Sequence, residues 1–200
     1  MKIYPMRYSG WLQKHWSKAM VYVFLADGFE EIEALAPVDI LRRGGVDVNT
    51  VGIGFEKITG SHGITVTCDL TEDKIKLENI DAIILPGGMP GTTNLEKSKT
   101  VDNAIEYAYK NEKIIGSICA APSIIGKKGI LNGKSATCFP GFEQYLEGAH
   151  LLDLPVVRDG KIITACGAGA ALDFGFSLLE ALKDKATASS LRRNMKYNWE

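Results

Sequence analysis

The sequence predicts an α/β fold in a single domain, with a mostly parallel sheet covered by helices on both faces. Short apolar runs, typical of buried strands, alternate along the chain with longer segments whose apolar residues recur at helical spacing. Strands that alternate with helices form parallel sheets whose two faces the helices cover. The chain has 200 residues and no internal repeat, which suits one domain with its own core.

The first half of the chain begins with a short apolar run at 21–25, which predicts a buried strand. Residues 30–43 follow at helical spacing, with acids in the first turn and arginines in the last, as the helix dipole favours. Gly44-Gly45 ends this helix and Pro37 predicts a kink in it. Three further strands are predicted, at 46–53, at 64–68 as a short strand near an edge, and at 81–85.

The second half continues the alternation. Residues 94–111 are predicted to form one helix, capped by Thr92, Thr93 or Asn94. Asp159-Gly160 is a strong hairpin signal. The remaining predicted elements are a strand at 113–118, a helix at 120–128, strands at 156–163 and 161–166 around that turn, and a long helix at 170–182 after Gly167-Ala168-Gly169.

Composition and charge exclude several classes of protein. The formal net charge is −1, so there is no electrostatic case for a nucleic-acid or membrane partner. No apolar run reaches the roughly 20 residues that a membrane helix needs. Three scattered histidines and four widely spaced cysteines predict neither a metal site nor a disulfide framework. Cys68, Cys138 and Cys166 are expected to be small buried apolar residues, and a cytoplasmic location with free thiols is expected.

Residues 1–19 differ from the rest of the chain. They contain four basic residues and no acidic one, without the unbroken apolar stretch of a secretory signal. A targeting presequence fits less well than an extension or a misassigned start. We therefore expect an N-terminal extension at 1–19 and one domain at 20–200.

No cofactor is predicted from the glycine clusters. Gly167-Ala168-Gly169 lacks the third glycine of a dinucleotide fingerprint and follows the last strand instead of the first. No glycine cluster is followed by the Gly-Lys-Ser/Thr of a phosphate loop. These glycines are expected to form packing turns.

Ligands of such sheets bind beyond the carboxyl ends of the strands, and one cysteine is predicted to lie there. Cys119 follows the strand at 113–118 at a sharp turn into a helix. The partial positive charge of a helix N-terminus favours the thiolate, so we expect a lowered pKa and a reactive thiol. Pro122 fits the first turn of that helix.

Two further strand ends supply candidate partners for this thiol. Gly87 and Gly88 allow backbone N–H groups to approach a bound atom, and with the N–H of Ala120 they form a candidate oxyanion hole; a tight turn explains them equally well. Glu33, one turn into the first helix, is the candidate acid. It would need a raised pKa to donate a hydrogen bond to sulfur, whereas Glu30 and Glu31 are expected to be solvated.

Four segments carry a resemblance to a known family. They are Gly28-Phe29-Glu30-Glu31-Ile32-Glu33, Leu85-Pro86-Gly87-Gly88 with Gly91 and Asn94-Leu95, Ile118-Cys119-Ala120-Ala121-Pro122, and Gly167-Ala168-Gly169 with Leu172-Asp173-Phe174; the Asn198-Trp199-Glu200 end also fits. Together and in this order they resemble the ThiJ/PfpI superfamily over about residues 20–200, and within it the branch of bacterial YajL and the human parkinsonism-associated deglycase.

This resemblance implies a flavodoxin-like three-layer sandwich and a cytoplasmic homodimer. It implies that Cys119 is a nucleophile or oxidation sensor, that Glu33 hydrogen-bonds it, and that Gly88 and Ala120 are the oxyanion donors. The substrates implied are small reactive carbonyls or peroxides. Relatives with glyoxalase activity place a histidine before the proline of the segment that holds Phe139 and Pro140 here, so these two residues are expected in the pocket and a histidine-assisted reaction is in doubt.

Three functions remain open on the sequence. The first is a redox-responsive stress protein in which Cys119 is oxidised to a sulfinate that protonated Glu33 stabilises. The second is a glyoxalase or deglycase that acts on small carbonyls such as methylglyoxal or their adducts. The third is a chaperone-like binding module. Peptidase and glutaminase activities are not expected, because Ala120 follows Cys119 where those relatives carry a histidine.

Overall fold

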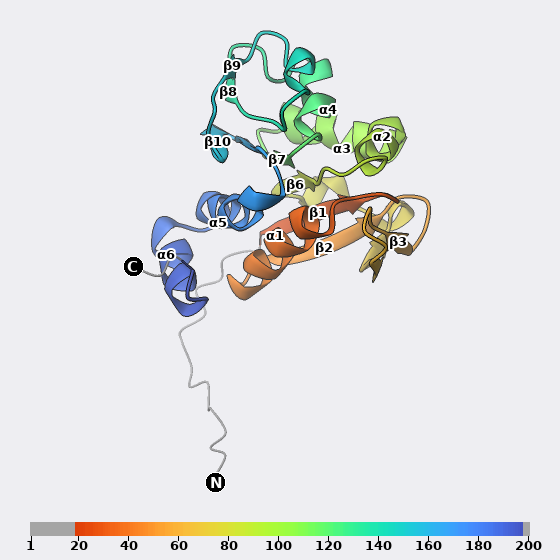
Figure 1. Ribbon diagram of the computed structural model, residues 1–200. Coiled ribbons are helices and arrows are strands. Elements are labelled where there is room, and N and C mark those ends of the chain that lie inside the picture. Colours follow the sequence, from red (N-terminus) through yellow and green to blue (C-terminus); the bar gives the residue numbers. More distant parts are fainter. Residues whose placement is uncertain (1–18, 198–200) are drawn as a thin grey trace.

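The computed structural model describes residues 19–197. These residues form a three-layer α/β sandwich (Figure 1). Its central sheet has seven strands in the order β10-β11-β7-β6-β1-β2-β5. Only β10 runs antiparallel to its neighbour; the other pairs in this sheet are parallel. The mostly parallel sheet and the flavodoxin-like fold expected from the sequence are confirmed.

The strands of the central sheet are β1 (Met20–Leu25), β2 (Asp47–Gly52), β5 (Leu70–Thr71), β6 (Ala82–Leu85), β7 (Ile114–Ile118), β10 (Val156–Asp159) and β11 (Ile162–Ala165). Two small sheets lie outside it and pair β3 (Lys57–Thr59) with β4 (Thr65–Thr67) and β8 (Ser135–Ala136) with β9 (His150–Leu151).

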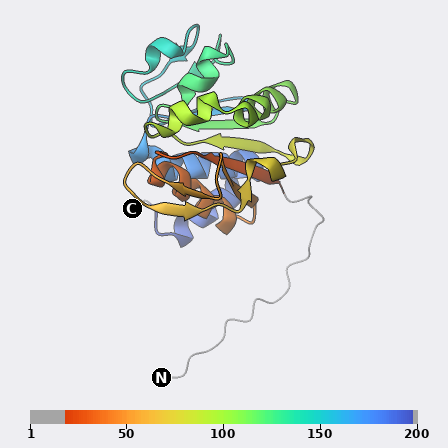
Figure 2. The ribbon, with the colours of Figure 1, turned by 90° about the vertical axis from the view of Figure 1, so that its right-hand side faces the viewer.

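The helices divide between the two faces of the sheet (Figure 2). One face carries α1 (Glu31–Arg43), α5 (Ala171–Leu182) and α6 (Lys185–Asn194), and the other carries α2 (Gly91–Lys97), α3 (Lys99–Lys110) and α4 (Pro122–Lys127). Alternate residues of β1 serve the two cores: Val21, Val23 and Leu25 pack under α1 and α5, while Tyr22 and Phe24 face the opposite layer. Both faces of the strand are buried, which explains its unbroken apolar run.

Two predicted elements differ in the structure. The strand expected at 64–68 exists as β4, but it pairs with β3 in a hairpin apart from the main sheet, whose edge is β5. The helix expected at 94–111 is two helices. Ser98 separates them, and its hydroxyl accepts a hydrogen bond from the N–H of Val101 at 3.3 Å, so it caps α3. The predicted caps at 92–94 lie inside α2 instead.

The chain order of the strands explains where a site can form. The connections from β1 lead to β2 on one side and then, after β5, to β6 on the other side. Loops that leave β1 and β6 therefore diverge to opposite faces and open a crevice at their carboxyl ends. The turns after β1, β6 and β7 meet along this edge.

Two other expectations concern the ends and the membrane. Of the extension expected at 1–19, all but Ala19 lies outside the described residues, as does the 198–200 end. The Ala19 carbonyl accepts a hydrogen bond from Asp47 N–H at 3.1 Å, so this residue already extends the β1–β2 ladder. Within residues 19–197 no helix combines the length and apolar character that spanning a bilayer requires.

Candidate functional site around Cys119

Cys119 directly follows β7 and has a left-handed backbone with φ of +64°. Two hydrogen bonds hold it there: its N–H donates to the Ala165 carbonyl, and its carbonyl accepts from Phe139 N–H, both at 2.9 Å. Such a conformation costs a non-glycine residue roughly 1–3 kcal/mol and is concentrated at functional sites. The turn therefore presents the thiol at the carboxyl edge of the sheet, as the sequence predicted.

Glu33 reaches the same point from the first turn of α1. It is 1% exposed, and its Oε2 accepts a hydrogen bond from the N–H of Gly87 at 2.9 Å. A Cβ atom at position 87 would lie 2.6 Å from the Cys119 Cβ and 2.6 Å from Glu33 Oε2. The loop after β6 thus packs closely against both the thiol and the carboxyl group, and only glycine fits at position 87.

The protonation states of the two side chains are linked. Burial raises the pKa of Glu33 to about 7, although hydrogen bonds with Cys119 and Gly87 act in the opposite direction. Burial, and then the charge of Glu33, raise the pKa of Cys119 to about 12. Near neutral pH, the Cys119 thiol therefore stays protonated, whereas the neighbouring Glu33 carboxyl group gains and loses its proton.

The raised pKa of the thiol is a correction to the sequence-based expectation. The helix expected to stabilise the thiolate is α4, which begins only at Pro122 and has six residues. Desolvation and the neighbouring carboxylate outweigh the backbone N–H groups that favour the thiolate. The expected rise in the pKa of Glu33 is present in the structure, so this carboxyl group suits a general base or acid near neutral pH.

Gly88 and Ala120 contribute the backbone N–H groups predicted at the sulfur. Both groups lower the pKa of Cys119, because they stabilise negative charge on Sγ. Gly88 has φ of +86°, and a Cβ there would lie 2.3 Å from the backbone nitrogen of Glu30. Glycine is therefore required by both conformation and contact.

Phe139 and Pro140, the predicted pocket residues, line a cavity of about 800 Å³ next to this site. Its wall is mainly apolar and also includes Leu151, Leu152 and Cys166. Cys119 is not part of the lining; the link is the hydrogen bond from Phe139 N–H to its carbonyl. The cavity therefore adjoins the turn that carries the thiol.

Comparison with known proteins places this arrangement in a family. The sequence model of the DJ-1/PfpI family matches residues 19–181. The chain belongs to the DJ-1/PfpI family. It is 31% identical over 176 residues to dj-1beta of Drosophila melanogaster, covering 86% of this chain and 94% of that protein. The resemblance to this superfamily and to its DJ-1-like branch, expected from the four segments, is confirmed.

Two other known proteins are similar to this chain over most of its length. A Caenorhabditis elegans protein named glutathione-independent glyoxalase DJR-1.2 is 29% identical over 175 residues, covering 87% of this chain and 94% of that protein. A solved structure of oxidized Toxoplasma gondii DJ-1 superposes with a TM-score of 0.86 at 30% identity, covering 90% of this chain and all of that one.

The other three cysteines differ from Cys119 in their surroundings. Cys68 and Cys138 are buried, as predicted, and burial raises the pKa of each thiol to about 11. Cys166 is partly exposed instead of buried and lines the cavity beside Phe139. It is therefore the natural comparison for Cys119 in experiments on thiol reactivity.

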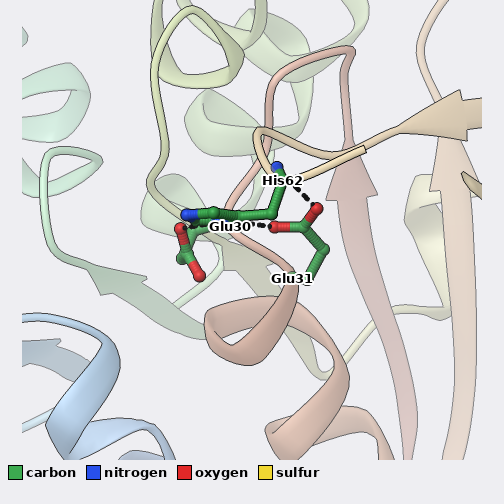
Figure 3. Close-up of side chains that lie close together, drawn as sticks. All are labelled: Glu30, Glu31 and His62. Carbon is green, nitrogen blue, oxygen red and sulfur yellow. Dashed lines mark hydrogen bonds and ion pairs between the residues drawn. The ribbon is translucent and has the colours of Figure 1, made fainter. Parts of the chain in front are cut away.

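A second polar cluster lies at the start of α1, where solvated acids were expected. Glu31 is only 5% exposed, and its Oε1 accepts hydrogen bonds from His62 N–H at 2.8 Å and from Ile64 N–H at 3.4 Å. Burial alone raises the pKa of Glu31, but these bonds and that of the His62 ring hold it at about 2. Figure 3 shows the ring of His62 reaching between the carboxyl groups of Glu30 and Glu31. No pattern in the sequence signals this contact, because His62 lies about 30 residues away on the β3–β4 loop.

Proposed function

We propose that this DJ-1/PfpI protein is an oxidative-stress protein in which Cys119 is a redox-sensitive nucleophile toward hydroperoxides. The observation that carries the proposal is the packing of a buried carboxyl group, Glu33, against Gly87 and the thiol of Cys119. A carboxyl group with a pKa of about 7 accepts and returns a proton at physiological pH.

The proposed reaction conserves atoms and charge. Glu33 takes the thiol proton as sulfur attacks the terminal oxygen of a hydroperoxide and the O–O bond breaks. The proton then passes to the leaving alkoxide, which gives a Cys119 sulfenic acid and an alcohol. A second hydroperoxide converts the sulfenic acid to a sulfinic acid and leaves as a second alcohol. The sulfinic acid then loses its proton, and the N–H groups of Gly88 and Ala120 stabilise the oxygens of the sulfinate.

Glu33 has an atom suited to this exchange. Its Oε2 is held by Gly87, whereas its Oε1 is buried without a hydrogen-bond partner among the described residues. A buried carboxyl oxygen without a partner costs free energy, and a polar reactant beside it removes that cost. We therefore assign Oε1 the transfer of the proton to the leaving oxygen.

Oxidation by hydrogen peroxide, followed by peptide mass spectrometry, tests this function. We expect Cys119 to gain oxygen before Cys166, and Glu33→Leu to slow its oxidation more than Glu33→Gln, which still donates a hydrogen bond. Faster oxidation of Cys166 than of Cys119, or equal rates in wild type and both Glu33 variants, would contradict the proposal. Cys166→Ser serves as the control and should leave oxidation of Cys119 unchanged.

A glyoxalase or deglycase function is the second candidate, and the named activity of the C. elegans relative favours it. Cys119 would add to the aldehyde carbon of a 2-oxoaldehyde, with the N–H groups of Gly88 and Ala120 on the oxyanion. Phe139 cannot assist proton transfer, so Glu33 alone would have to move the proton from carbon. Lactate formation from methylglyoxal by wild type, absent in Cys119→Ser, would establish this activity.

A homodimer in a reducing cytoplasm is also part of the proposal. It rests on the family and on free thiols, which persist where disulfides do not form. Sedimentation velocity tests the assembly: we expect one species of twice the mass of the 21.8 kDa chain. A monomer at micromolar concentration would contradict the dimer without bearing on the chemistry of Cys119.

A further inference from the structure

Four side-chain atoms of different chemistry converge where the β3–β4 loop meets the start of α1. They are Oε2 of Glu30, Oε2 of Glu31, Oγ of Ser61 and Nδ1 of His62. Nδ1 lies 2.9 Å from the Glu31 oxygen and 3.4 Å from the Glu30 oxygen. Oγ lies 3.2 Å from the Glu30 oxygen, 3.5 Å from the Glu31 oxygen and 3.2 Å from Nδ1.

These distances are close to the edges of a small coordination polyhedron. A Zn²⁺ ion binds histidine nitrogen and carboxylate oxygen at about 2.0–2.2 Å, so neighbouring ligand atoms of a tetrahedral site lie about 3.3–3.6 Å apart. Five of the six edges of the cluster measure 2.9–3.5 Å; two of these five lie within the tetrahedral range and three are slightly shorter. Small side-chain movements would bring all four atoms into contact with one ion.

The charge of the cluster also favours a cation. Two carboxylate oxygens lie within 3.5 Å of the same hydroxyl, and their side chains are 15% and 6% exposed, so water screens them poorly. Glu31 is fixed by backbone N–H groups on its other oxygen, which leaves Oε2 directed at the cluster. A protonated His62 supplies one positive charge, and a divalent ion supplies two.

We propose that Glu30, Glu31, Ser61 and His62 form a site for a divalent transition-metal ion of the Zn²⁺ type. The imidazole nitrogen selects against Mg²⁺ and Ca²⁺, which take oxygen ligands. The 68% exposure of the His62 side chain gives an ion access from solvent. This site is distinct from Cys119, and the proposal does not depend on the reaction of the thiol.

Metal binding would join two elements that the sequence keeps apart. Glu30 and Glu31 begin α1, while Ser61 and His62 lie in the loop between β3 and β4. A bound ion would hold the β3–β4 hairpin against α1, the helix that carries Glu33. The N–H of Glu30 also donates to the carbonyl of Gly87 at 3.0 Å, so the site lies beside the loop that contacts Cys119.

Titration of the metal-free full chain with Co²⁺, read by visible absorption, tests the site, and competition with Zn²⁺ measures affinity. We expect one saturable site with tetrahedral Co²⁺ bands and no sulfur-to-cobalt band. Removing partners that only surround a metal ligand already costs about 10–100-fold in affinity, so His62→Gln should weaken binding at least tenfold. Zn²⁺ should also raise the melting temperature of wild type and not that of His62→Gln.

His62→Arg separates a metal site from a simple ion pair, because arginine keeps a positive charge between the carboxylates but does not bind the metal. We expect it to retain the melting temperature of the metal-free protein and to lose the Co²⁺ signal. His150 is an exposed histidine on β9, so His150→Gln is the matched control and should bind Co²⁺ like wild type. Unchanged binding by His62→Arg, a sulfur-to-cobalt band lost in Cys119→Ser, or no saturable binding at all would overturn the proposal.

Discussion

Gly87 shows how one residue without a side chain makes the site possible. The loop after β6 passes so close to Cys119 and Glu33 that a methyl group has no room. The N–H of Gly87 meanwhile holds Oε2 of Glu33 at 2.9 Å. The same residue therefore permits the contact between thiol and acid and fixes the orientation of the acid.

We predict that Gly87→Ala slows oxidation of Cys119 by about tenfold to 100-fold, because the new methyl group displaces the thiol and the carboxyl group by a substantial part of an ångström. Overpacking of this kind also destabilises a fold by roughly 1–3 kcal/mol. Rates from peptide mass spectrometry, with urea unfolding alongside, measure both effects. Gly169→Ala is the control, since a Cβ there meets no atom within 4 Å. Equal rates for the two variants would show that Gly87 does not shape the site.

The titration of Glu33 predicts a pH dependence of stability. Its pKa rises from 4.5 to about 7 on folding, so between these values the folded state binds more protons than the unfolded state. Stability from this group is full below pH 4.5 and is lost as pH rises to about 7. The loss is on the order of 3 kcal/mol, from 1.36 kcal/mol for each pKa unit.

Glu33→Gln should remove this dependence, because glutamine stays neutral at every pH. We predict that the difference in unfolding free energy between the variant and wild type moves in favour of the variant from about pH 5 to about pH 7. Urea unfolding across this range provides the measurement. Parallel pH curves for the two proteins would mean that Glu33 is already ionised in the folded protein at the acidic end of the range.

Among the helices and strands, Ser98 decides where one helix ends and another begins. The sequence pattern runs through this position without a break, since Leu95, Val101 and Ile105 are all buried on the same layer. The backbone at Ser98 is extended, with φ of −74° and ψ of 122°, and its hydroxyl caps α3. A capping interaction has thus outweighed the continuous helical periodicity.

We predict that Ser98→Ala destabilises the fold by about 1 kcal/mol, because the N–H of Val101 loses its side-chain acceptor. Thr93→Ala, at one of the caps expected from the sequence, lies inside α2 and should change the unfolding free energy by less than about 0.5 kcal/mol. Chemical unfolding of the two variants tests this. A larger effect at Thr93 than at Ser98 would restore the single-helix interpretation.

For the molecule as a whole, residues 19–197 contain the seven-stranded sheet and both helical layers. The family match starts at residue 19, and the first ladder bond from the Ala19 carbonyl belongs to the β1–β2 pair. We predict that deleting residues 1–18 lowers the melting temperature by less than about 3 °C, or under about 1 kcal/mol for a domain of this size. A larger fall in differential scanning calorimetry would show that the segment stabilises the domain.

The arrangement of the sheet also explains why the site residues come from distant parts of the sequence. Glu33 follows β1, Gly87 follows β6 and Cys119 follows β7, and these three strands are adjacent and parallel. Their carboxyl ends consequently lie side by side. Any sequence that produces this strand order brings the three turns together, whatever residues occupy them.

Local patterns in the sequence were enough to predict most elements, the family and the position of Cys119 at the end of a strand. Apolar runs predicted the buried strands, Asp159-Gly160 predicted the turn between β10 and β11, and four short segments predicted the family. These features are local, because strand burial, turn conformation and close backbone approach each act on residues that are neighbours in the chain.

The properties that depend on burial and on distant contacts came from the tertiary structure alone. The pKa of Cys119 is raised where a local argument expected it to fall, because desolvation and Glu33 act together. Glu31 is buried where a first-turn acid was expected to be solvated, because the β3–β4 loop folds over it and brings His62 to its carboxylate. Both outcomes depend on the electrostatic environment, which is set by atoms close in space and far apart in sequence.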